Sequence, residues 1–218
     1  NLILTAKKNK IKISIINARI TKKTFKRWMM IPKTAKSIFS SFDLCLSSSR
    51  ETQEYLTRLN ARNIFFFGNI KFINNINISE NDNSLKELSK KNKIWIAVST
   101  HKGEEEFCLR VHLLLKKKYG NLITIIAPRH LDRTQYIKSL CDQFKLSNQV
   151  LKKNEDILEK KEIIIINFYG MLSKFLNQID IAFIGKSTLK RLEEVGGQSP
   201  IEAAKHGCKI YHGPYVYN

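Results

Sequence analysis

Short apolar runs alternate with longer amphipathic stretches along most of the chain. The run KIWIAVST at residues 93–100 is apolar at nearly every position, which is typical of a strand buried on both faces of a parallel sheet. A helix is expected next, at 103–118. Repetition of this pattern predicts the strands 121–128, 162–168, 179–185 and 208–213, with the helices 131–145, 169–177 and 199–207 between them. We therefore expect a doubly wound, mainly parallel α/β domain over residues 93–218.

The same alternation begins earlier in the chain, where it predicts the strands 11–19, 43–49 and 63–72 and the helices 21–40 and 50–61. The stretch NNINISENDNS at 74–84 breaks the pattern, because it is rich in Asn and lacks apolar periodicity. We interpret residues 74–92 as a linker between an incomplete Rossmann-like domain, 1–73, and the domain at 93–218. From its first and last residues, we also expect the chain to be truncated at both ends.

Charge is the most unusual feature of the composition. The 218 residues include 38 Lys and Arg against 19 Asp and Glu, which gives a net charge of +19. A surplus of this size predicts an anionic partner, which would be nucleic acid, acidic lipid or phosphorylated small molecules. The alternative is that about half of the surplus is solvated surface in a Lys-rich protein.

The cysteines and histidines exclude several kinds of site. The four cysteines lie far apart without a CxxC pair, and the five histidines form no metal-binding motif. No structural zinc site is therefore expected, and the cysteine usage suits a reducing compartment. No apolar run reaches 18 residues and no signal peptide is visible, so the sequence predicts no membrane-spanning helix.

Polar residues follow the predicted strands, at the carboxyl ends of the strands, where parallel α/β sheets bind ligands. Ser99, Thr100 and His101 follow the strand at 93–100, and Arg129 with His130 follows the next strand. Each has a structural alternative. Ser99 or Thr100 would cap the following helix, and the charged residues would be ordinary loop residues.

The loops near the C-terminal end of the chain suggest an anion site. The sequence GKST at 185–188 is not a P-loop, because Asp180 stands where that motif needs glycine. Gly196 and Gly197, directly before a predicted helix, favour phosphate binding together with the arginine after the second strand. Glu202 has two interpretations, since it would either form a capping box with Ser199 or accept hydrogen bonds from a ribose. The residues together predict a nucleotide or nucleotide-sugar pocket.

Five motifs give the chain a family resemblance. NAR (17–19), GNIKF (68–72), STHKGEE (99–105), PRHLDR (128–133) and GGQSPIEAA followed by GP and N (196–218) occur in the order found in 3-deoxy-D-manno-octulosonic acid (Kdo) transferases. The chain resembles this family from residue 1 to 218. The resemblance implies a GT-B fold of two Rossmann-like domains, the second binding most of the donor. It also implies transfer of Kdo from CMP-Kdo to a lipid A precursor, with inversion at the anomeric centre and no metal or cofactor.

The resemblance also assigns roles to residues. Residues 1–73 would belong to the acceptor-side domain and 93–218 to the CMP-sugar domain. Lys71 would stabilise charge in the transition state. The CMP contacts would come from Pro128 and Arg129, from Tyr169, Gly170 and Met171 near the cytosine, and from Ser199, Pro200, Ile201 and Glu202 around phosphate and ribose. Further candidates are Ser99, Thr100, His101, Gly196 and Gly197.

The chain departs from the family at several positions. Asn167-Phe168-Tyr169-Gly170-Met171 replaces the usual Asp-Thr-Met/Ile-Gly-Glu, and Gly185-Lys186-Ser187 replaces Gly-Gly-Ser. The family's general base is a glutamate expected upstream of residue 1. We therefore expect donor binding, but no transferase activity, from residues 1–218 alone.

The resemblance implies a peripheral or anchored protein at the cytoplasmic face of the bacterial inner membrane. The basic helix at 21–40 would contact the anionic membrane. Two alternatives stay open: a GT-B enzyme that uses a UDP-sugar, and a basic nucleic-acid-binding protein. The second is disfavoured, because the aromatic residues lie mostly inside apolar runs and no nucleic-acid-binding motif is present.

Overall fold

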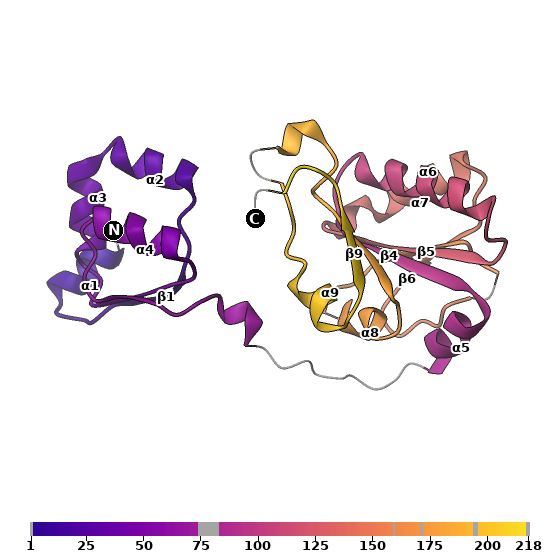
Figure 1. The fold of residues 1–218 in the computed structure, drawn as a ribbon, viewed down its shortest axis with the longest axis horizontal. Coiled ribbons are helices and arrows are strands. Elements are labelled where there is room, and N and C mark those ends of the chain that lie inside the picture. The colour runs from indigo at the N-terminus through magenta and orange to yellow at the C-terminus, as the bar shows by residue number, and fades with distance from the viewer. Residues whose placement is uncertain (1, 74–82, 159, 171, 194–195, 217–218) are drawn as a thin grey trace. The chain divides into compact units, whose positions relative to one another are not determined.

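Parallel strands connected by helices form both parts of the structure, a computed structural model (Figure 1). It describes residues 2–73, 83–158, 160–170, 172–193 and 196–216. The chain divides into two compact units, Asn1–Asn75 and Ile76–Asn218, which we call unit 1 and unit 2.

Unit 1 contains a three-stranded parallel sheet in the order β1-β2-β3. In the register of this sheet, Cys45 lies beside Ile15 on one strand and Ile64 on the other. The elements of unit 1 are α1 (Leu2–Lys8), β1 (Ser14–Ala18), α2 (Lys22–Met29), α3 (Pro32–Phe39), β2 (Leu44–Ser47), α4 (Arg50–Arg58), β3 (Ile64–Phe66) and the 3-10 helix η1 (Ile70–Phe72).

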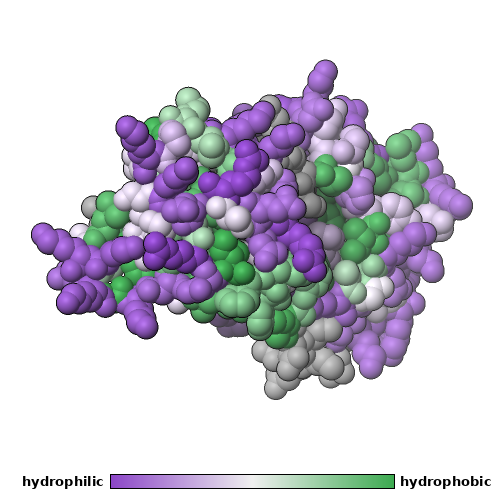
Figure 2. Space-filling model, turned by 60° about the vertical axis from the view of Figure 1, so that its left-hand side comes forward, coloured by the Kyte–Doolittle hydropathy of each residue, from purple (hydrophilic) through white to green (hydrophobic). Residues whose placement is uncertain are grey.

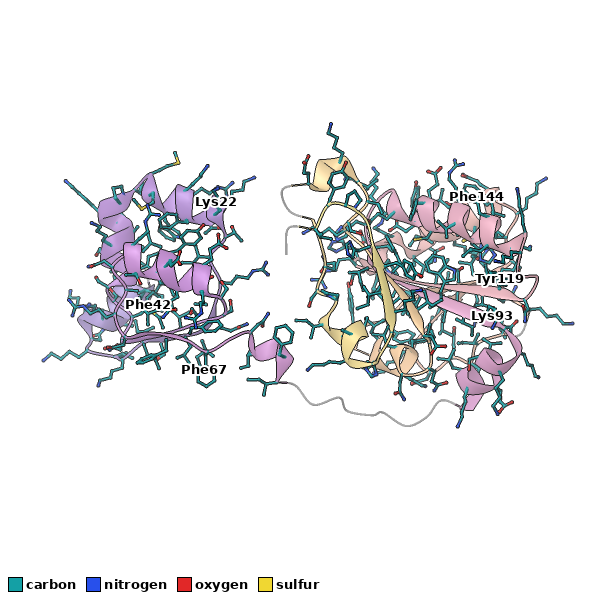
Figure 3. The ribbon with its side chains drawn as sticks, viewed as in Figure 1. Lys22, Phe42, Phe67, Lys93, Tyr119 and Phe144 are labelled. Carbon is teal, nitrogen blue, oxygen red and sulfur yellow. The ribbon has the colours of Figure 1, made fainter. Side chains whose placement is uncertain are left out.

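The core of unit 1 lies between its helices and one face of the sheet. Phe25 of α2, Phe39 of α3 and Leu56 of α4 pack in one cluster with Cys45 of β2. Figure 3 shows Phe42 inside this unit and Phe67 projecting from it. The fractional exposures of Phe42 and Phe67 are 8% and 69%.

The predicted helix at 21–40 is wrong as a single element, because it is two helices. α2 ends at Met29, and α3 begins at Pro32 after Ile31. Proline lacks the N–H that a helix interior needs and pushes the preceding residue out of the helical region. Ile31 has φ −127° and ψ 59°, which is outside the helical region. The chain therefore forms an exposed corner between the two helices.

Unit 2 contains a six-stranded sheet in the order β6-β7-β5-β4-β8-β9, in which every neighbouring pair is parallel. The strand order reverses at β4, which is where doubly wound sheets bind ligands. The elements of unit 2 are α5 (Asn83–Lys91), β4 (Lys93–Thr100), α6 (Glu104–Lys116), β5 (Leu122–Pro128), η2 (Leu131–Arg133), α7 (Thr134–Gln143), β6 (Asn148–Leu151), β7 (Ile163–Ile166), α8 (Leu172–Leu176), β8 (Ile181–Ile184), η3 (Lys190–Leu192), α9 (Ile201–Lys205) and β9 (Lys209–His212).

Alternate residues of the strands of unit 2 face two separate cores. Ile96 and Val98 of β4 belong to the core that includes residues of α5, α8 and α9. Trp95 and Ala97 of the same strand belong to the core with residues of α6 and α7. Figure 1 shows these two sets of helices on opposite faces of the sheet. The apolar runs in the sequence thus reflect burial on both faces.

Two elements of unit 2 differ from the sequence predictions. The expected linker at 74–92 is wrong over 83–91, where α5 puts Leu85 and Leu88 into the core, and residues 74–82 lie outside the described residues. The strand β6, Asn148–Leu151, was not predicted, because its sequence NQVL has only two apolar residues. Among the described residues, no helix is both long and apolar enough to cross a bilayer.

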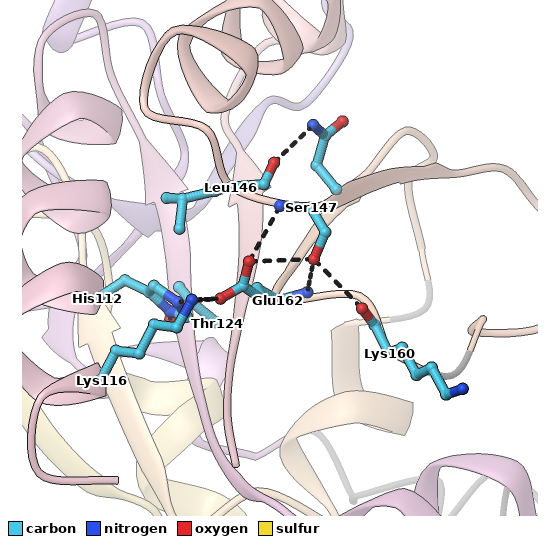
Figure 4. Close-up of polar contacts among 8 residues, drawn as sticks. His112, Lys116, Thr124, Leu146, Ser147, Lys160 and Glu162 are labelled. Atoms are coloured by element: carbon cyan, nitrogen blue, oxygen red, sulfur yellow. Dashed lines mark hydrogen bonds and ion pairs between the residues drawn. The ribbon is translucent and has the colours of Figure 1, made fainter. Parts of the chain in front are cut away.

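A polar cluster fixes the start of β7 (Figure 4). The carboxylate of Glu162 pairs with Lys116 and accepts hydrogen bonds from the backbone N and Oγ of Ser147, both at 3.1 Å. Burial alone raises the pKa of Glu162, but the hydrogen bonds from Lys116 and Ser147 outweigh it and lower that pKa. Nearby, the imidazole of His112 is buried against the Thr124 hydroxyl at 2.8 Å, and this burial lowers its pKa.

Candidate functional site

A cavity of about 210 Å³ opens at the carboxyl ends of β4, β5 and β7 in unit 2. This volume is below the roughly 300–1,000 Å³ of pockets that enclose a drug-sized ligand. The cavity therefore suits one part of a larger ligand. Its lining residues are Val98, Ser99, Ala127, Pro128, Arg129, Ile166, Phe168, Tyr169, Gly170, Leu172 and Glu202.

Arg129 presents a positive charge at this cavity. Its backbone N donates to the carbonyl of Thr100 at 3.0 Å, which fixes the loop after β5 against the end of β4. Its side chain is exposed and forms no ion pair with any acidic residue in the described part of the chain. An exposed guanidinium without an acidic partner can form two parallel hydrogen bonds with a phosphate.

The loop after β7 forms another wall. Tyr169 is 65% exposed, and its hydroxyl donates to the backbone carbonyl of Arg129 at 3.4 Å. Gly170 has φ +89°, which a side chain would strain, so the turn after Tyr169 requires glycine. Pro128 lines the same cavity. Met171, predicted beside the cytosine, lies outside the described residues.

Glu202 lies on the cavity, but it does not cap its own helix. α9 begins at Ile201 with Pro200 as N-cap, and no side chain makes a capping hydrogen bond. The capping-box alternative with Ser199 is therefore wrong. Glu202 is only the second helical residue, too early to reach back as a residue at the third position does. Its Oε1 instead accepts a hydrogen bond from Oγ of Ser173 on α8, at 2.8 Å.

The segment before α9 forms backbone hydrogen bonds with the loop after β8. Gly197 has φ +84°, and its N donates to the carbonyl of Lys186 at 2.6 Å. Gln198 donates in the same way to Gly185 at 3.3 Å. These two amides are thus used inside the protein. The five residues of α9 also provide only a short helix, so a phosphate site at Gly196 and Gly197 has less support than the sequence indicated.

The backbone N–H groups of the loop at 185–188 bind a carboxylate of the protein itself, that of Glu104. The carboxylate of Glu104, which is fully buried, accepts from the backbone N atoms of Lys186 (2.6 Å), Ser187 (2.8 Å) and Thr188 (3.1 Å). It also accepts from the hydroxyl of Thr188 at 3.0 Å and from the backbone N of His101 at 3.0 Å. This carboxylate fills the backbone cradle that a phosphate would otherwise need.

The next residue of α6 is also buried and charged. Glu105 forms a two-point ion pair with Arg133, with N–O distances of 3.1 and 2.9 Å. Sequence reasoning did not single out these two glutamates. Their signal was the run of three acidic residues, Glu104–Glu106, directly after Gly103, at a helix start where negative charge is favourable.

Ser99 and Thr100 end β4 without capping α6. The N-cap of α6 is Gly103, so the capping alternative for Ser99 or Thr100 is wrong. Ser99 has φ +56° and lines the cavity. Thr100 is buried, and its hydroxyl has no hydrogen-bond partner among the described residues. A Cβ on Gly185 would lie 2.6 Å from the carbonyl O of Ser99, so the ends of β4 and β8 can touch only because that residue is glycine.

His101 lies beside the cavity but does not line it. Its Nε2 is 3.5 Å from Nε2 of Gln198, and its ring meets the ring of His130 edge-on at 5.7 Å. Burial lowers the pKa of His101, and the nearby Glu104 offsets only part of this effect. The imidazole is therefore mainly neutral at pH 7.

Lys71 belongs to unit 1, in η1, and its side chain lies outside the described residues. The structure therefore brings together Ser99, Pro128, Arg129, Tyr169, Gly170 and Glu202. The role of Lys71 stays a prediction.

Comparison with known sequences supports the family resemblance. The family model for 3-deoxy-D-manno-octulosonic-acid transferase (kdotransferase) matches residues 1–74. The chain is 31% identical over 227 residues to a probable mitochondrial 3-deoxy-D-manno-octulosonic acid transferase of Arabidopsis thaliana, covering 99% of this chain and 50% of that protein. It is 29% identical to the 3-deoxy-D-manno-octulosonic acid transferase of Haemophilus influenzae, covering 100% of this chain and 51% of that protein. The chain thus spans about half the length of the curated relatives it matches.

Solved structures share the fold. The C-terminal CMP-Kdo binding domain of WaaA from Acinetobacter baumannii matches with a TM-score of 0.53 at 18% identity, covering 62% of this chain and 73% of that chain. A putative UDP-N-acetylglucosamine 2-epimerase from Listeria monocytogenes matches with a TM-score of 0.55 at 14% identity, covering 95% of this chain and 51% of that chain. The predicted α/β, GT-B-like fold is thereby confirmed. The sequence matches extend over the whole chain, which is therefore similar throughout to about half of each of these Kdo transferases.

Proposed function

We propose that this chain is part of a transferase that moves Kdo from CMP-Kdo to a lipid A precursor in lipopolysaccharide biosynthesis. Unit 2 would bind the CMP-Kdo donor. The observation that supports this proposal is the meeting of Arg129, Tyr169 and Glu202 at one cavity, on the sheet edge where nucleotides bind. The residues come from three different loops or helices.

Each of these residues offers a different contact with CMP. The guanidinium of Arg129 suits the phosphate, because it is a charged fork with no acidic partner among the described residues. The carboxylate of Glu202 suits the ribose hydroxyls, with Ser173 holding one carboxylate oxygen in position. Tyr169 and Gly170 would border the base. The cavity volume allows it to take the base or the ribose, with the rest of the donor outside.

The proposed reaction is an inverting displacement. A hydroxyl of the lipid acceptor attacks the anomeric carbon of Kdo, the bond from that carbon to the phosphate oxygen breaks, and CMP leaves with the bonding electrons. A general base takes the hydroxyl proton. The charge that develops on the leaving CMP is the charge that Arg129 would stabilise, and Lys71 would act similarly on the acceptor side. This scheme needs no metal or cofactor.

The proposal also assigns the two units. Residues 1–73 would belong to the acceptor-side domain and residues 93–218 to the donor domain. The protein would work at the cytoplasmic face of the inner membrane, in contact with anionic lipid. The net charge of +19 supports an anionic surface as a partner.

Nucleotide titration by calorimetry tests this proposal. We expect CMP to bind at least tenfold more tightly than UMP or UDP. Tighter binding of UDP would instead support an enzyme that uses a UDP-sugar. Absence of nucleotide binding, with strongly salt-dependent binding to an oligonucleotide, would support a nucleic-acid-binding protein and contradict the proposal.

A further inference from the structure

The positive charge of this protein is concentrated in unit 1. Residues 1–75 contain fifteen Lys and Arg against three Asp and Glu, a net charge of +12. Residues 76–218 contain twenty-three against sixteen, a net charge of only +7 over almost twice the length. The first acidic residue of the whole chain is Asp43, so the eleven basic residues before it have no acidic neighbour in the sequence.

The corner between α2 and α3 exposes three consecutive apolar side chains. Met29, Met30 and Ile31 are 40%, 80% and 50% exposed. The corner is held from inside, because Trp28 packs edge-on against Phe39 at 5.3 Å. A run of exposed apolar residues on a rigid support is costly in water, and in a functional protein it marks a binding surface.

Basic residues flank this apolar run on both sides. Lys26 and Arg27 precede it on α2, and Lys33 and Lys36 follow it on α3. All four are exposed. Figure 2 shows apolar side chains at the surface among hydrophilic ones on the face that it presents. An apolar tip surrounded by cationic side chains is the arrangement that binds the interface of an anionic bilayer.

We propose that the α2–α3 corner, residues 26–36, is the surface that docks on an anionic lipid bilayer. Met30 and Ile31 enter the interfacial region, and the flanking Lys and Arg side chains contact lipid phosphates. The apolar tip favours lipid over nucleic acid, because it offers neither charge to a phosphate nor an aromatic face to a base. This inference deepens the membrane contact of the proposed function by naming the surface that makes it.

The two tryptophans of the chain, Trp28 and Trp95, make a direct test feasible. In a Trp95→Phe protein, Trp28 is the single tryptophan, can be excited selectively over the seven tyrosines, and lies beside the corner. We expect this protein to bind vesicles of phosphatidylcholine with phosphatidylglycerol and to ignore phosphatidylcholine alone. Lipids with acyl chains brominated near the headgroup should quench the fluorescence of Trp28. Binding to a nucleic acid would bring no brominated group near this side chain.

Matched variants separate the corner from general surface charge. Met30→Ser with Ile31→Ser should weaken vesicle binding at least tenfold, while Leu114→Ser with Leu158→Ser, exposed in unit 2, should not. Lys33→Gln with Lys36→Gln should weaken binding about fivefold for each charge removed. The control for charge is Lys117→Gln with Lys145→Gln.

The outcomes are distinct. Equal binding to both vesicle types, absence of quenching, or unchanged binding by the Met30→Ser, Ile31→Ser protein would overturn the inference. Binding to an oligonucleotide but not to vesicles would assign the charge to nucleic acid instead. CMP affinity is measured on the same variants, so failure of the lipid contact and failure of the proposed nucleotide site are separate results.

Discussion

The carboxylate of Glu104 accepts two hydrogen bonds from Thr188, which lies 84 residues further along the chain. One comes from the backbone N at 3.1 Å and the other from the hydroxyl at 3.0 Å. Glu104 begins α6, directly after the loop that leaves β4, and Thr188 lies in the loop that leaves β8. This contact therefore fixes the loops that follow β4 and β8 to one another, at the carboxyl ends of the strands of unit 2.

Glu104→Gln should lower the free energy of unfolding by about 2–4 kcal/mol, because the new amide N–H₂ faces backbone N–H donors and leaves them unsatisfied. The measurement is urea unfolding followed by the fluorescence of Trp95, in a Trp28→Phe background. Glu106→Gln on the same helix is the control. It loses only an exposed pair with Arg110, which contributes less than about 0.5 kcal/mol. Equal effects of the two substitutions would mean that the buried carboxylate has no special role.

Arg129→Ala should weaken CMP binding about 10- to 100-fold, the loss expected for about 1.5–3 kcal/mol of charge-assisted hydrogen bonding. The CMP affinity of Arg129→Lys should lie between those of the parent protein and Arg129→Ala, because lysine keeps the charge but cannot form two parallel hydrogen bonds with a phosphate. Calorimetric titration with CMP measures both. The control is Arg110→Ala, an exposed arginine on α6 away from the cavity. An unchanged affinity in Arg129→Ala would remove the arginine from the site.

Glu202→Ala should weaken CMP binding by a similar factor and change the free energy of unfolding by less than about 0.5 kcal/mol, because Glu202 caps no helix. Ser173→Ala should have a smaller effect of the same sign, since it removes only the group that orients the carboxylate. If Glu202→Ala lowers stability and leaves CMP affinity unchanged, its role is structural.

Acidification should destabilise unit 2 in two stages. Burial lowers the pKa of His112 below its ordinary value of about 6.5, so the unfolded state binds more protons and stability falls as the pH drops through that range. The lowered pKa of Glu162 adds stability that is present above about pH 4.5 and is lost on further acidification. The unfolding midpoint of the Trp28→Phe protein measures both stages.

His112→Asn should reduce the drop in this midpoint between pH 7 and pH 5.5, although it also lowers the midpoint at both values by leaving a void. A part of the drop remains in this variant, because burial lowers the pKa of His101 as well. The same pH dependence in His112→Asn and in the parent protein would contradict the assignment to His112.

The apolar pattern predicts the main strands well because both faces of the unit 2 sheet are buried. The predicted strand at 93–100 has the bounds of β4. β6 is an edge strand, so its sequence needs fewer apolar residues and has no comparable signal. Leu85 and Leu88 of α5 are one helical turn apart, which is a helical pattern. It was missed because the residues around them are mostly polar.

The candidate site is only partly predictable from sequence, for physical reasons. Arg129 and Glu202 are 73 positions apart in the sequence, and the strand order alone brings them to one cavity. The spacing around GKST excluded a P-loop, but it could not show that the backbone N–H groups of this loop bind the buried carboxylate of Glu104, because no local pattern reveals that burial. For the same reason, the interpretation of Glu202 as a cap could be rejected only once the start of α9 was known.

CMP is expected to bind at the cavity formed by the carboxyl ends of β4, β5 and β7, with its base or ribose inside and its phosphate at the mouth. A crystal structure of this protein grown with CMP tests it most directly. We expect the phosphate within hydrogen-bond distance of the Arg129 guanidinium and a ribose hydroxyl on the Glu202 carboxylate. CMP bound elsewhere, or in this cavity without either contact, would contradict the account.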